Sequence, residues 1–125
     1  MVSSFKRIVV SQGRALNLNP GLTDLLADGA SLMAAPAKLV NFTAQVPVAS
    51  SEKFTYQDSS GLVQSSTENL QVTWFASTGD FQYVRTSLLD SNQFTPGGAA
   101  LGGHPIFIGV VRDGRGGEAI LQKNF

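Results

Sequence analysis

The feature that most limits the fold of this chain is a strict two-residue alternation around its only tryptophan. In ENLQVTWFAS (residues 68–77), successive side chains divide into two sets. One set is Leu70, Val72, Trp74 and Ala76, and the other is Gln71, Thr73, Phe75 and Ser77. A period of two indicates a β-strand with one buried face, because successive strand side chains point to opposite sides.

Similar segments recur along the chain between turn residues. AKLVNFTAQVPV (37–48) also alternates, and HPIFIGVVRD (104–113) is a nearly continuous apolar run, typical of a strand covered on both faces. GGEAILQKNF (116–125) follows it, and we expect the two to form a hairpin across DGRG. TDLLADG (23–29) fits either one helical turn or an irregular edge strand. Further strands are expected in 5–11, at the start of 53–66, and in 79–89.

About seven short strands, at intervals of roughly eight to twelve residues, predict an all-β fold, and a core tryptophan favours an antiparallel β-sandwich. The predicted core consists of Leu70, Val72, Trp74, Ile106, Ile108, Val110 and Ile120. In the corner RDGRGG, we expect Asp113 to accept backbone N–H bonds while the glycines take positive φ. The predicted structural turn is therefore Asp113, Gly114, Gly116 and Gly117.

These segments carry a family resemblance. ENLQVTWFASTGDFQYVRT, NQFTPG and PIFIGVVRDGRGGEAI together resemble the bacterial immunoglobulin-like domains, related to PKD and cadherin-like modules, of secreted lipoproteins and surface proteins. The resemblance implies one immunoglobulin-like domain over residues 17–125. It departs from the family in GGAALGGH (97–104), which is longer and richer in glycine than the usual connection. Residues 1–16 are then an N-terminal strand and linker, either from a preceding similar domain or an added edge strand of this sandwich.

Composition excludes several classes of function. Nine basic and nine acidic side chains are scattered singly, so the basic stripe of a nucleic-acid-binding protein is missing. The 14% of charged residues is low against the usual ~25%, which favours an exported module over a cytosolic enzyme. The absence of cysteine removes disulfides and thiolate chemistry. Apolar runs are far shorter than the ~20 residues that a membrane-spanning helix needs. No signal peptide is visible at the start of the sequence, and a lipid anchor upstream of it is a further possibility.

Candidate sites are few. RDGRGG offers backbone N–H groups to an anion, but a phosphate loop opens a helix and here a strand is expected, so the turn is preferred. Arg112 and Arg115 give a cationic tip of only two charges. The aspartates that a calcium site would draw on are isolated in sequence, and we expect no metal there: Asp58, Asp80, Asp90 and Asp113. The single histidine, His104, has no recognisable triad partners, and we expect neither catalysis nor a cofactor.

We therefore expect a non-enzymatic module of a bacterial periplasmic, outer-membrane-anchored or extracellular protein. It would serve as a structural spacer or a protein-interaction domain, with neighbouring domains or another surface protein as partners. If the strand from Phe5 to Ser11 lacks a partner in this chain, pairing with a second copy would give a homodimer. The alternative is a carbohydrate- or calcium-dependent adhesin, with Phe75, Tyr83 and Phe94 as an aromatic platform; a small hydrolase is a third reading.

Overall fold

The computed structural model describes residues 17–98 and 104–125. In this part the chain is all-β, and every strand pair is antiparallel. Its one helical element is a short 3-10 turn, η1 (Val48–Ser50). The strand predicted at 5–11 and most of the glycine-rich loop lie outside the described residues.

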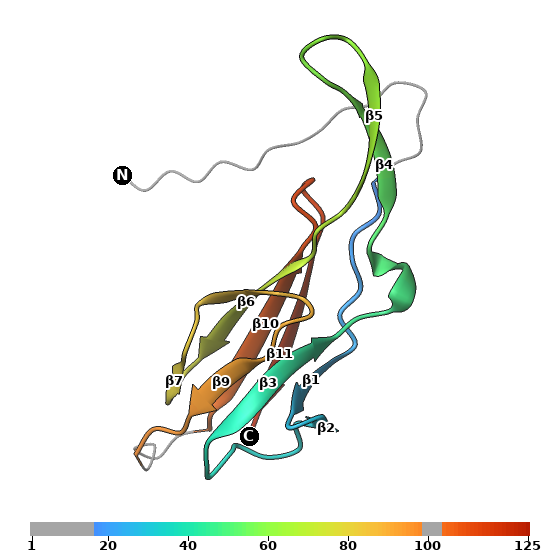
Figure 1. The fold of residues 1–125 in the computed structure, drawn as a ribbon. Helices are drawn as coiled ribbons and strands as arrows, with labels where there is room; N and C mark the ends of the chain where they lie inside the picture. Colours follow the sequence, from blue (N-terminus) through green and yellow to red (C-terminus); the bar gives the residue numbers. More distant parts are fainter. Residues whose placement is uncertain (1–16, 99–103) are drawn as a thin grey trace, which may run out of the picture.

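Two sheets face each other and a third projects beyond them (Figure 1). The five-stranded sheet has the order β2 (Ala30–Ser31), β1 (Asp24–Ala27), β3 (Val40–Gln45), β9 (Asn92–Thr95), β7 (Asp80–Phe81). The four-stranded sheet has the order β11 (Glu118–Asn124), β10 (Ile106–Arg112), β6 (Gln71–Ala76), β8 (Arg85–Ser87). The hairpin arm, β4 (Lys53–Gln57) and β5 (Val63–Thr67), forms a two-stranded sheet of its own.

Two of the expected segments differ in detail from the structure. Residues 23–29 contain the strand β1, whose Leu25 is fully buried, so the helical alternative is wrong. The single strand expected in 79–89 is divided, because β7 belongs to the five-stranded sheet and β8 to the four-stranded one. The buried amide of Asn92 fixes this crossing: its Oδ1 accepts the Tyr83 N–H at 3.0 Å and its Nδ2 donates to the Tyr83 carbonyl at 2.7 Å.

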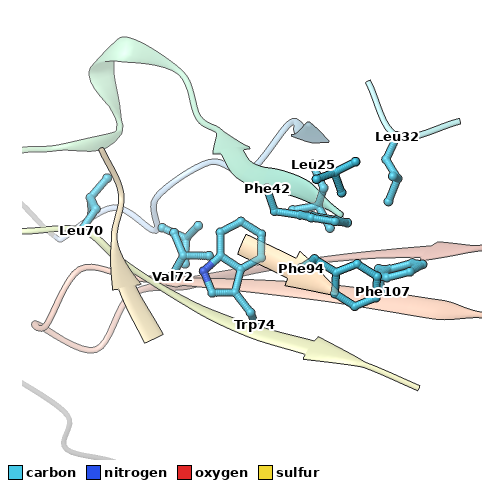
Figure 2. Packing of buried hydrophobic residues seen from close by; sticks show 10 residues of the cluster. Leu25, Leu32, Phe42, Leu70, Val72, Trp74, Phe94 and Phe107 are labelled. Carbon is cyan, nitrogen blue, oxygen red and sulfur yellow. The ribbon is translucent and has the colours of Figure 1, made fainter. Parts of the chain in front are cut away.

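The core lies between the two facing sheets and is built on aromatic rings (Figure 2). Phe42 from the five-stranded sheet stands 6.1 Å from Trp74 and 5.6 Å from Phe107, both of the four-stranded sheet, between ring centroids. Leu70 and Val72 precede Trp74 in the same cluster. Aromatic pairs at such separations stabilise the fold by more than the burial of their surface alone, and these pairs connect the two sheets.

Only some of the side chains of strand β10 point into the core. Phe107 and Val111 point inward, and a Cβ on Gly109 would come within 2.7 Å of Leu25, so glycine lets the facing sheet approach. The alternate residues point away: Ile106 and Ile108 are half-buried, and Val110 is buried but outside the core cluster. Ile120, opposite Val110 on β11, is 63% exposed, so its predicted place in the core is wrong. A run made only of apolar residues does not indicate which face of the strand packs against the other sheet.

The tip of the hairpin arm is organised by one carboxylate. Asp58 accepts hydrogen bonds from the Ser60 hydroxyl at 2.6 Å, the Ser60 N–H at 2.9 Å, the Leu62 N–H at 3.0 Å and the Gln64 amide at 3.0 Å. Gly61 completes the turn with φ of 87°. These bonds favour the charged form and lower the pKa of Asp58 from 3.8 to about 2. The bond from the Ser60 hydroxyl has the largest effect on this pKa, and the bond from the Gln64 amide has the next largest.

This arrangement predicts an acid-resistant turn. An NMR titration of the Asp58 carboxyl should give a midpoint at about 2, with Ser60→Ala moving it back toward 3.8 and Ser59→Ala leaving it in place. Because the folded pKa is depressed, the bonds stabilise the turn above pH 3.8 and are lost as pH falls through about 2. A wild-type midpoint near 3.8 would contradict the arrangement.

Candidate functional site

The corner between β10 and β11 is held by the buried carboxylate of Asp113. Its Oδ1 accepts the N–H of Arg115 at 2.7 Å and that of Gly117 at 2.9 Å, and its Oδ2 accepts the Asn17 amide at 2.8 Å. Gly114 and Gly116 have φ of 77° and 105°, as expected for this turn. Gly117 differs from the expectation: it has no positive φ, and glycine is required because a Cβ would lie 2.1 Å from Asp113 Oδ2.

The corner carries Arg115 to the base of the hairpin arm. Its Nη1 lies 2.7 Å from Oε1 of Glu68, whose side chain is fully buried, and its guanidinium stands 4.4 Å from the Phe54 ring centroid. Glu68 also accepts the N–H of Glu52 at 3.0 Å. Since an unpaired buried charge is costly, Arg115 is committed to this pair and ties the arm to the corner.

Two further arginines lie on the outer face of the four-stranded sheet, on either side of β6. Arg112 on β10 donates from Nη1 to Thr73 Oγ1 at 3.1 Å, and its Nε lies 3.5 Å from Oε2 of Glu118. Arg85 on the edge strand β8 is directly opposite the same Thr73. In the part of the chain that the structure describes, the Arg85 guanidinium has no hydrogen bond or ion pair.

These side chains line a pocket of about 670 Å³ where the hairpin arm meets the four-stranded sheet. Its walls are three arginines, one aromatic ring, four neutral polar side chains and the corner itself: Arg85, Arg112, Arg115, Phe54, Thr67, Asn69, Gln71, Thr73, Asp113 and Gly114. This volume lies within the usual range of ligand sites, ~300–1,000 Å³. The pocket offers positive charge and hydrogen-bonding groups to a ligand, and we call it the arginine pocket.

The other candidate residues predicted from the sequence do not lie together in the structure. Phe94 is 1% exposed and sits in the core, so the three-ring platform is wrong, although Phe75 and Tyr83 are each about half exposed. His104 is exposed just ahead of β10. Across residues 17–98 and 104–125, no group of three or more His, Cys, Asp or Glu side chains is placed to hold a metal ion.

Sequence reasoning missed Arg85, Phe54 and Glu68 as members of the site. The pairing of β6 with both β8 and β10 brings Arg85 to the same face as Arg112. Phe54 and Glu68 join the site through their contacts with Arg115. The signal in the sequence is the alternation itself: it places Gln71 and Thr73 on the polar face of the tryptophan strand, and both side chains line the arginine pocket.

A comparison with protein-family models finds no match, and comparisons with curated proteins and with solved structures find none. Within the described ranges, no helix has the length and apolar character needed to cross a membrane.

Proposed function

We propose that this chain is a non-enzymatic, immunoglobulin-like module of a bacterial exported or surface protein, which serves as a structural spacer and contacts neighbouring domains. The low charge content and the similarity of the tryptophan strand and RDGRGG corner to such modules support this proposal. The antiparallel sheets that face each other across Trp74 and Phe42 are the architecture that the proposal requires.

The observation that carries the spacer role is the position of the two ends of the described chain. Asn17 is bonded to Asp113, directly after the last residue of β10, while the Phe125 N–H donates to the carbonyl of Pro105, directly before its first residue. In Figure 1 the described part of the chain begins in blue beside the hairpin arm and ends at the opposite pole. A seven-residue strand spans about 23 Å, so Asn17 and Phe125 lie at opposite ends of the sandwich, which is the placement that a spacer requires.

The hairpin arm lies at the pole where the chain enters. Near its base, Glu52 accepts the Leu18 N–H at 3.1 Å, while its outer part exposes Tyr56, Leu62 and Val63. In a row of modules joined end to end, this apolar surface would face the preceding module. The preceding module is therefore the neighbour that we assign to the arm.

The spacer role predicts an extended tandem. In small-angle X-ray scattering, three copies of the full chain joined head to tail should increase the maximum dimension by an equal step per copy. A compact globule made of all three joined copies would instead have a radius of gyration of about 21 Å. Changing Leu62 and Val63 to serine should leave single copies folded and broaden the distance distribution of the tandem.

Two results would contradict the spacer role. One is a three-copy tandem with the compact radius, and the other is scattering from a single full chain that shows it to be unfolded. A tandem that is extended but insensitive to the two serine changes would overturn only the contact assigned to the arm.

A further inference from the structure

We infer that the arginine pocket binds the carboxylate of an acidic sugar, such as a uronic acid unit of a polysaccharide. This assignment adds a ligand to the spacer role and does not depend on it. It rests on the two arginines that flank Thr73 and on the neutral side chains around them.

The first step concerns the positive charges of the two arginines beside Thr73. Arg112 reaches Thr73 from β10, and Arg85 is placed against it from β8, since directly paired residues on one face have Cβ atoms about 4.5–5.5 Å apart. Glu118 stands beside Arg112 at 3.5 Å, on the β11 side. No described carboxylate is paired with Arg85. The guanidinium groups of Arg85 and Arg112 thus line one pocket, and Glu118 is the one described carboxylate paired with either of them, so an anion bound there would meet uncompensated positive charge.

The second step is the shape of the anion. A guanidinium binds a planar carboxylate through two parallel N–H bonds, and this geometry favours arginine over lysine. Arg115 is less available, because Glu68 and Phe54 already engage it. The carboxylate is therefore assigned to Arg85, with Arg112 as the second donor.

The third step separates a sugar from an acidic peptide. Around the arginines, Thr67, Asn69 and Gln71 are exposed neutral side chains without a hydrogen bond to the described protein. Amide and hydroxyl groups match the vicinal hydroxyls of a sugar ring, which both donate and accept. A run of glutamates would use the charges and leave these groups to water. Phe54 adds an apolar wall, as is common in ligand sites.

The test is a titration of the full chain with tetragalacturonate, followed by NMR. Saturable shifts are expected at the backbone amides of Gln71, Thr73, Arg85 and Arg112. The methyl ester of the same oligosaccharide should give none, because it lacks the charge. Arg85→Gln should weaken binding by about tenfold or more, the usual effect of removing a charged hydrogen-bond partner, and Arg85→Lys by less.

Two variants make the test specific. Lys38→Gln removes an exposed cation outside the pocket and should leave affinity unchanged. Glu118→Gln removes the competitor for Arg112 and should tighten binding, a gain that a purely structural role for these residues would not produce. The amide spectrum of each variant checks that it is folded.

Three outcomes would overturn the assignment. The first is the absence of saturable shifts with tetragalacturonate. The second is hexaglutamate binding at the same amides as tightly as the sugar, which would make the ligand an acidic protein segment. The third is equal binding of inorganic phosphate, which would reduce the pocket to a general anion site. None of these outcomes bears on the dimensions of the tandem.

Discussion

Replacing Trp74 with alanine is expected to lower the free energy of unfolding by about 3–5 kcal/mol, the usual cost of truncating a large aromatic side chain in a core. Trp74 is 3% exposed and contacts Phe42 and Phe81, with ring centroids at 6.1 Å and 5.5 Å. Its indole Nε1 also donates to Thr86 Oγ1 at 2.9 Å. The truncation would remove contacts across the sheet interface and leave a cavity that two rigid sheets are unable to close.

Urea denaturation of the wild type and the variant measures this loss. Thr86→Val separates the packing from the hydrogen bond, since it removes the acceptor and keeps the ring, and should cost about 1 kcal/mol. Phe75→Ala is the matched control on the same strand, because that ring is half exposed on the other face of the sheet. A loss below about 1 kcal/mol for Trp74→Ala would show that the tryptophan is not in a packed core.

The second large effect is expected at the β10–β11 corner. Asp113 is 3% exposed and accepts three hydrogen bonds, so Asp113→Ala would leave the Arg115 and Gly117 N–H groups without their acceptor. Each lost bond to a charged group costs ~1.5–3 kcal/mol, and we expect a total loss of roughly 3 kcal/mol or more. Asp113→Asn keeps one acceptor oxygen and should lose less.

The control for the corner is Asp90→Ala. That aspartate is exposed, and among the described residues its side chain has no hydrogen-bond partner, while its backbone N–H donates to the Ser87 carbonyl at 3.1 Å. Such a surface change usually stays within about 0.5 kcal/mol. Equal unfolding energies for the Asp113 and Asp90 variants, measured in the same denaturation series, would remove Asp113 from its structural role.

The extent to which the sequence predicts this fold is clearest at the tryptophan strand. There the alternation separates Val72 and Trp74 from Gln71 and Thr73, and the structure buries the first pair in the core and places the second on the outer face. In β10 the same reasoning has no contrast to use, because every second residue is apolar on both sides. The pattern therefore predicts Ile106 and Ile108 in the core where the structure has Phe107 and Val111, and it places Ile120 on the wrong face, whereas Val110 is buried as predicted.

The arginine pocket could be predicted only in part. Arg112 and Arg115 are close in sequence, and the corner that positions them was recognisable from its glycines and Asp113. Arg85 is not predicted, because the pattern of residues 79–89 indicates one strand, whereas the crossing from one sheet to the other depends on the buried Asn92. A site assembled by strand register has no local motif, since the register is set by packing of the whole sandwich.

The most direct test of the module account is the distance between its two ends. The chain has no cysteine, so Leu18→Cys and Asn124→Cys place two spin labels at positions that are exposed in the structure. Pulsed electron paramagnetic resonance should give a narrow distribution at about 23 Å or longer, the length of β10. The control pair, His104→Cys with Asn124→Cys, lies at one pole and should show a separation of about 10 Å as line broadening. A Leu18–Asn124 distance as short as that of the control pair would contradict a module connected through opposite ends.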